Sequence, residues 1–160
     1  MRRSRIFKLV MLGTLIAGLL VAVAAVFADH TWYSSGEPLY WKGDNLNPTV
    51  ADKTKSNLYD VPAAVTEWAD LNTPVQPKNT SKKNGEIIVQ EGYSPDWLGL
   101  AQVFLELEAD GQLHITKGKV TMNTTLLSGP DFGAFVANHV LGQEVGHVIG
   151  LDHNHDWIRS

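Results

Sequence analysis

The residues with the clearest chemical potential lie near the end of the 160-residue chain. Gln143 and His147 are four positions apart, so on an α-helix their side chains share one face, about 6 Å apart along the axis. Glu144 stands beside that face, where a carboxylate can reach a metal-bound water without binding the metal. Gly150 falls where such a helix would end, because glycine accepts the left-handed conformation that reverses the chain. His153 could then fold back toward the same point.

The donors in this run are typical of a catalytic zinc site. Such a site has three protein ligands and keeps one position open for water. Zinc lowers the pKa of that water to about 7, and a nearby carboxylate takes its proton as the water attacks a peptide carbonyl. We therefore expect Zn2+ to be bound by Gln143, His147 and His153, with Glu144 as the general base.

Gln143 is the unusual member of this set. Its amide oxygen is neutral, like an imidazole nitrogen, but it is a harder and poorer donor for zinc. We therefore expect a lower zinc affinity than three imidazoles would give, and a metal that stays more Lewis acidic. Whether Gln143 binds the metal at all is left open by the sequence.

Other side chains near this run are weaker candidates. His139 is eight residues before His147, about 12 Å along a helix, which is too far to share a zinc at roughly 2.1 Å from each ligand. We interpret His139 as a helix-face or core histidine, with a contact to a ligand as the alternative. His155 could replace His153, because the turn after the glycine is flexible. Three further residues are not expected to be ligands: Asp152, His30 and His114.

The N-terminus has the composition of an export signal. Four basic residues come first: Arg2, Arg3, Arg5 and Lys8. An apolar run from Leu9 to Phe27 follows, and Val26-Phe27-Ala28 is an acceptable cleavage site. The run is also just long enough to span a bilayer. We expect residues 1–28 to be a signal peptide of a secreted, extracellular protein, with an uncleaved membrane anchor facing outside as the alternative.

Residues 29–160 are long enough for one hydrophobic core and too short for two domains. Without the basic residues of the leader, 9 Lys and Arg stand against 17 Asp and Glu, a net charge of −8. This charge argues against nucleic acid and anionic membrane surfaces as partners. Cysteine is absent, so stability must come from packing, with a bound metal as a further contribution.

Apolar periodicity predicts an α/β fold for this single domain. Strands are expected at 39–42, 86–91, 98–108 and 113–123, with a turn at Asp110-Gly111 and a polar loop over 72–85.

Two helices are expected, and the sequence allows two possible start positions for each. The first covers 60–71, with Pro62 in its first turn and Val65, Trp68 and Leu71 on its apolar face. Alternatively it begins near Pro48 and kinks at Pro62. The second helix covers 130–150, with an N-cap at Ser128 or Asp131.

The run Gln143–His153, Q-E-V-G-H-V-I-G-L-D-H, resembles the metzincin zinc-peptidase signature H-E-x-x-H-x-x-G-x-x-H, with glutamine in place of the first histidine. With Trp97–Gln102 and His114–Val120, it resembles a group of secreted bacterial matrixin-like proteins that often carry this glutamine. The resemblance implies a twisted, mostly parallel sheet with two main helices, the second bearing the ligands. It implies peptide-bond hydrolysis by a zinc-bound water, with the roles given above for Gln143, Glu144, His147 and His153.

Metzincins also place a methionine-containing turn beneath the zinc, after the third ligand. Here seven residues follow His153, and the methionines, Met1, Met11 and Met122, all lie upstream. We therefore expect the matrixin-like domain to be truncated after the third zinc ligand, with its C-terminal subdomain largely missing and its specificity pocket incomplete.

Three interpretations follow. The first is a secreted zinc-dependent metalloendopeptidase with a protein or peptide substrate. The second is a catalytically weak or inactive pseudopeptidase that binds an extracellular protein or peptide without cleaving it. The third is a fragment that does not fold cooperatively.

Overall fold

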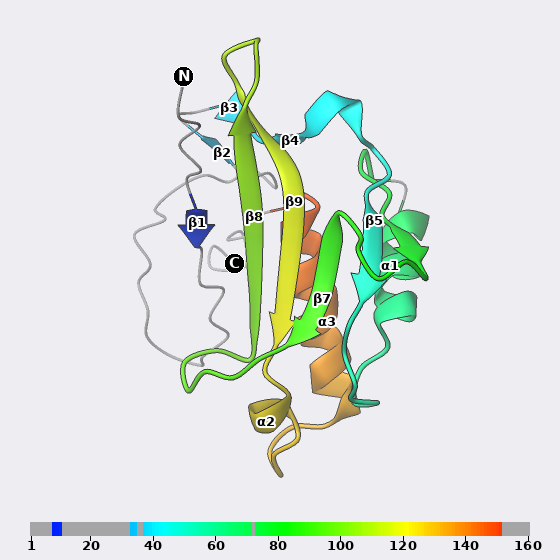
Figure 1. Cartoon of the computed structure of the whole chain (residues 1–160). Helices are drawn as coiled ribbons and strands as arrows, with labels where there is room; N and C mark the ends of the chain where they lie inside the picture. Colours follow the sequence, from blue (N-terminus) through cyan, green and yellow to red (C-terminus); the bar gives the residue numbers. More distant parts are fainter. Residues whose placement is uncertain (1–7, 11–32, 35–36, 72, 152–160) are drawn as a thin grey trace, which may run out of the picture.

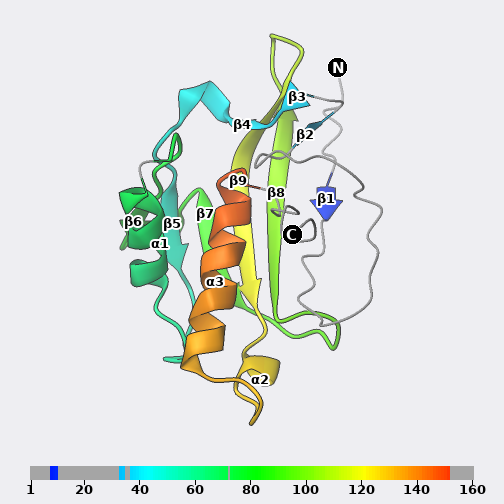
Figure 2. The ribbon, with the colours of Figure 1, turned by 180° about the vertical axis from the view of Figure 1, so that it is seen from behind.

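The computed structural model of the chain describes residues 8–10, 33–34, 37–71 and 73–151. They form a mixed α/β fold in which the two longer helices lie on one face of a central sheet, as Figures 1 and 2 show from opposite sides. This confirms the α/β fold class expected from the sequence.

The elements follow one another along the chain in the order of their numbers. The strands are β1 (Lys8–Val10), β2 (Tyr33–Ser34), β3 (Glu37–Pro38), β4 (Tyr40–Trp41), β5 (Thr49–Asp52), β6 (Lys78–Thr80), β7 (Ile87–Glu91), β8 (Gly99–Leu107) and β9 (Leu113–Met122). The helices are α1 (Val61–Asp70), α2 (Thr124–Leu127) and α3 (Ala134–Val148), with a short 3-10 turn at Lys42–Asp44.

The central sheet has the strand order β1-β8-β9-β7-β5-β6, and β4 also pairs with β9. Strands β4, β5, β6, β7 and β9 run parallel, whereas β8 is antiparallel to β9. The sheet is therefore mostly parallel, as expected. A separate antiparallel pair is formed by β2 and β3.

Three residues of the expected signal peptide belong to the described part of the chain. Lys8–Val10 form β1, which pairs antiparallel with residues 102–104 of β8. The rest of the segment 1–28 lies outside the described residues. Within the described ranges, no helix has the length and hydropathy needed to cross a bilayer.

The hairpin of β8 and β9 matches the expectation from the sequence. Its register places Gly99 opposite Met122 and Val103 opposite Gly118. The turn contains Gly111 with φ 83°, a conformation that favours glycine.

Helix α1 begins where the sequence predicted, but the last residue of its predicted apolar face is exposed. The Asp60 side chain caps the helix by accepting a hydrogen bond from the Ala63 N–H at 3.0 Å, which is the usual role of aspartate at this position. Val65 is buried, whereas Leu71 is 64 % exposed, because it is the C-cap residue beyond the last helical turn. The prediction that Leu71 shares the buried face was wrong.

The alternative start of this helix near Pro48 is also wrong, because Thr49–Asp52 form β5. The Glu86 carboxylate accepts hydrogen bonds from the Thr49 backbone N–H at 2.6 Å and from its hydroxyl at 2.8 Å. The predicted polar loop 72–85 likewise contains a strand, since Lys78–Thr80 form β6 beside β5.

Helix α3 begins later than predicted. Its N-cap is Gly133, which has no side chain that could accept a hydrogen bond from the first helical turn. The predicted N-caps at Ser128 and Asp131 were therefore wrong. Ser128 is instead the C-cap of the short helix α2. The Asn123 side chain caps α2 at its other end by accepting from the Leu126 N–H at 3.2 Å.

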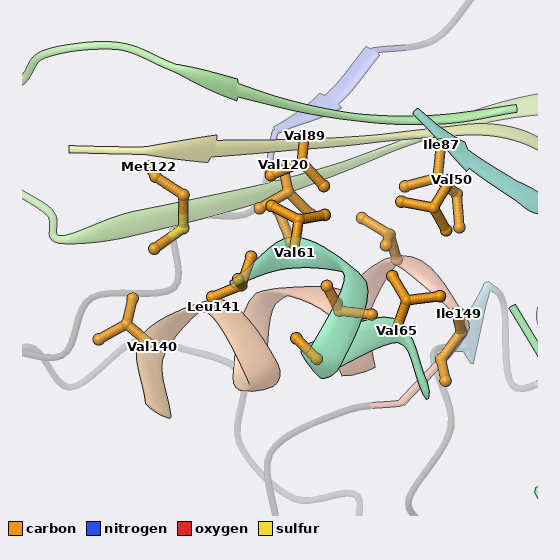
Figure 3. Packing of buried hydrophobic residues seen from close by; sticks show 14 of the residues in the cluster. Val50, Val61, Val65, Ile87, Val89, Val120, Met122, Val140, Leu141 and Ile149 are labelled. Atoms are coloured by element: carbon orange, nitrogen blue, oxygen red, sulfur yellow. The ribbon is translucent and has the colours of Figure 1, made fainter. Parts of the chain in front are cut away.

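The hydrophobic core lies between the sheet and the two longer helices, as Figure 3 shows. The residues at its centre include Val50, Val61, Val65, Ile87, Val89, Val120, Met122, Val140, Leu141 and Ile149. Burying a side chain of this size stabilises the fold by about 1.5–3 kcal/mol. The core therefore fixes α3 against β8 and β9.

Candidate active site

Three of the predicted site residues lie on α3. Gln143 is partly exposed, whereas Glu144 is 3 % exposed and His147 is 5 % exposed. All three lie in the last two turns of the helix, so the predicted helical placement of Gln143 and His147 is confirmed.

The end of α3 has the predicted glycine turn. Gly150 has φ 114°, its N–H donates to the His147 carbonyl at 3.1 Å, and the Leu151 N–H donates to the Gly146 carbonyl at 3.1 Å. These two bonds form a Schellman motif, which satisfies the last helical carbonyls and reverses the chain.

The His147 ring is oriented by this turn. Its Nδ1 lies 2.8 Å from the Leu151 carbonyl oxygen, which can only accept a hydrogen bond. Nδ1 therefore carries the proton, and in the neutral ring Nε2 carries the lone pair. Metal-binding histidines commonly use this tautomer, with the other ring nitrogen bonded to a carbonyl or carboxylate.

Glu144 lies against the first residues of β8. A methyl carbon on Gly99 would lie only 2.6 Å from the Glu144 Cγ and 2.7 Å from a Val140 methyl group. Only glycine therefore lets α3 approach the strand this closely. The Ala101 N–H donates a hydrogen bond to the Glu144 carboxyl group.

The second carboxyl oxygen of Glu144, Oε2, is buried and has no hydrogen-bond partner among the described residues. A buried oxygen without a partner is costly, and such groups often have a role in catalysis or ion binding. The carboxyl group is thus held by the strand through one hydrogen bond, while Oε2 is unbonded within the described ranges.

Burial raises the pKa of Glu144 to about 7, and the hydrogen bond from the Ala101 N–H opposes part of this shift. A carboxyl group with a pKa near neutral pH can both accept and return a proton, which is the property of a general acid or base. Perturbed pKa values of this kind are concentrated at functional sites.

Other predicted residues are not brought into this site. His139 is exposed on α3, in agreement with its interpretation as a helix-face histidine. The His114 Nε2 lies 2.9 Å from Asp110 in the β8–β9 hairpin.

The third predicted ligand, His153, lies outside the described residues, as do Asp152, His155 and His30. Within the described ranges, no group of three or more His, Cys, Asp or Glu side chains could hold a metal ion.

Of the predicted site residues, His147 thus has the tautomer that a metal ligand uses, and Glu144 has a buried carboxyl oxygen without a hydrogen-bond partner among the described residues. Sequence reasoning missed the contacts from Gly99, Ala101 and Leu151, because they depend on packing and on the helix end. The Trp97–Gln102 patch was noted for its resemblance, but its spacing alone did not reveal the contact with Glu144.

No protein-family model matches the chain, and a search of curated proteins also found no match.

Proposed function

We propose that the chain is a secreted zinc-dependent metalloendopeptidase that hydrolyses peptide bonds. The observation that carries the proposal is the Glu144 carboxyl group, which is buried and has a pKa raised to about 7. One of its oxygens has no hydrogen-bond partner in the part of the chain that the structure describes. Glu144 lies three residues before a histidine whose Nδ1 is bonded to a carbonyl. The resemblance of residues 143–153 to the metzincin signature supports the same assignment.

In this proposal His147, Gln143 and His153 hold the zinc ion. When bound, zinc supplies a Lewis acid that lowers the pKa of a water molecule and polarises the substrate carbonyl. The Leu151 carbonyl keeps the His147 ring in the orientation and protonation state that ligation requires.

Glu144 acts as the general base. Its free oxygen accepts a proton from the attacking water and then returns it to the amine that leaves. The Ala101 N–H holds the carboxyl group against β8 during both transfers. Burial favours this role, because a carboxyl group with a pKa near 7 is a stronger base than an exposed one.

The test combines zinc content with hydrolysis. We expect about one zinc per chain by elemental analysis of the purified protein, as one catalytic site would bind, and loss of that zinc in His147→Ala. Glu144→Gln should keep the metal and lose peptide hydrolysis. The proposal fails if the native protein binds no zinc, or if hydrolysis survives the loss of the Glu144 carboxylate.

The alternative is an extracellular pseudopeptidase that binds a protein or peptide without cleaving it. The observation that favours it is Gln143, since an amide oxygen is a poorer zinc donor than imidazole. A protein without zinc that still binds a denatured protein or a peptide library would support this function.

A further inference from the structure

We propose that Trp68 of α1 is a positioning residue for the candidate site. It fixes α3 against β8 and thereby sets the location of the Glu144 carboxyl group. The effect on catalysis rests on the proposed function, whereas the effect on position can be measured in the metal-free protein.

The first contact is a hydrogen bond to the backbone of α3. The Trp68 Nε1–H donates to the Gly142 carbonyl at 2.7 Å. In an α-helix this carbonyl also accepts the N–H of the residue four positions later, here Gly146. The indole therefore adds a second donor to a helical carbonyl immediately before Gln143.

The second contact is between the indole ring and Gly146. A methyl carbon on Gly146 would lie 2.6 Å from Trp68 Cζ2 and 3.2 Å from Cη2. The ring thus lies directly against the helix backbone, in the segment between Glu144 and His147. Gly142 and Gly146 are four residues apart, so both contacts are on the same face of α3.

Another face of α3 is held with the same closeness by β8. At Gly99 the added methyl carbon would meet the Glu144 side chain at 2.6 Å. Helix α1 lies beside α3 on the same face of the sheet (Figure 2), so the indole and the strand hold the helix from two directions. A change at Trp68 therefore reaches Glu144 through the helix backbone.

The position of Glu144 is sensitive to small movements. Its carboxyl group has a hydrogen bond to Ala101 and is otherwise fixed by close packing on Gly99. A misplacement of about 1 Å in a catalytic group can cost on the order of 100-fold in rate. Trp68 is thus expected to affect catalysis without touching substrate.

The experiment compares Trp68→Phe with Trp41→Phe in the purified protein. Both remove an indole that packs on the core, Trp41 buried and Trp68 partly buried. Trp41 Nε1 has no hydrogen-bond partner among the described residues, whereas Trp68 Nε1 bonds to Gly142. Trp68→Phe should lower kcat for peptide hydrolysis about tenfold and change KM by less than about twofold. Trp41→Phe should leave kcat near the native value.

The second measurement, by NMR, does not depend on catalytic activity. In the zinc-free protein, the amide NMR signals of Ala101 and of residues 142–147 should move more in Trp68→Phe than in Trp41→Phe. An unchanged Ala101 signal in Trp68→Phe would overturn the inference. If the native protein shows no zinc binding or hydrolysis but the Ala101 signal still moves, the positioning of Glu144 is supported while the proposed function fails.

A pair of glycine variants gives the same test if Trp68→Phe does not fold. Gly146→Ala places a methyl group against the indole, whereas Gly142→Ala places one in open space. Both substitutions favour a helix by intrinsic propensity, so only the contact with Trp68 separates them. Gly146→Ala should shift the Ala101 amide signal and lower kcat, and Gly142→Ala should do neither; equal behaviour of the two would contradict the inference.

Discussion

Gly99 and Glu144 lie in direct contact across the interface between β8 and α3. The absence of a side chain on Gly99 leaves the space that the Glu144 Cγ occupies, since a methyl carbon there would lie 2.6 Å from it. The same approach lets the Ala101 N–H reach the carboxyl group. The closeness of this contact explains both the burial of Glu144 and the fixed position of its carboxyl group.

Gly99→Ala should therefore displace Glu144. Overpacking of this kind typically costs about 1–3 kcal/mol of unfolding free energy, and we expect hydrolysis to fall with it. Denaturant unfolding and a peptide-cleavage assay are the measurements, with Gly142→Ala as the control, because the same added carbon meets open space there. Native stability and activity in Gly99→Ala would show that Glu144 does not depend on this close approach.

The stability of the metal-free protein should depend on pH through Glu144. The pKa of this group is raised from 4.5 to about 7 in the folded protein because burial disfavours the charged form. The folded state therefore binds the proton more tightly than the unfolded state does. The resulting contribution of Glu144 to the free energy of unfolding is fully present below about pH 4.5 and is lost as the pH rises to about 7. The loss is on the order of 3 kcal/mol.

Glu144→Gln tests this dependence, because glutamine cannot ionise. The variant should be more stable than the native protein at pH 8 and should lose this advantage at pH 4, as measured by urea unfolding without zinc. A constant difference between the two proteins over this pH range would mean that Glu144 has an ordinary pKa.

The strands and helix with strong local patterns were predictable from the sequence. The apolar runs in β7, β8 and β9 and the start of α1, with Pro62 in its first turn, matched the structure, because burial and an early helical proline leave local signals. Strands β5 and β6 were missed, since they are short and β5 is bonded by the distant Glu86. The late start of α3 was missed because Gly133 gives no capping signal.

The candidate site was predictable only in part. The spacing of Gln143, Glu144 and His147 indicated one helix, and Gly150 indicated its end, since both follow from helix geometry. The contacts of Glu144 with Gly99 and Ala101 join residues far apart in the chain. No periodicity encodes such a contact, because it forms only when the helix packs on the strand.

Gln143→His should reveal whether the glutamine limits the site. Imidazole is a better zinc donor than an amide oxygen, so we expect the zinc affinity to rise by about tenfold or more, or roughly 1.4 kcal/mol. Competition with a zinc chelator measures the affinity, and peptide cleavage is followed in parallel. A gain in both would indicate a weakened zinc site, whereas a loss of both would indicate that glutamine is the working residue.

Asn123 should be one of the most important polar residues for stability. It is fully buried, donates from Nδ2 to the Trp97 carbonyl at 2.8 Å and also to the Ser94 carbonyl, and accepts the Leu126 N–H as the cap of α2. Asn123→Ala removes all three bonds, of which the one to the Trp97 carbonyl is buried and the other two are part-buried. A buried group without a partner costs about 1–3 kcal/mol, so we expect about 2 kcal/mol of destabilisation.

Thermal and denaturant unfolding measure this loss, with the exposed Asn84→Ala as the control. Because Asn123 holds the loop that leads into β8, the variant should also weaken the contact of Gly99 with Glu144. The Ala101 amide signal should therefore shift in Asn123→Ala and stay unchanged in Asn84→Ala. Destabilisation without such a shift would show that the loop before β8 is held independently of the site.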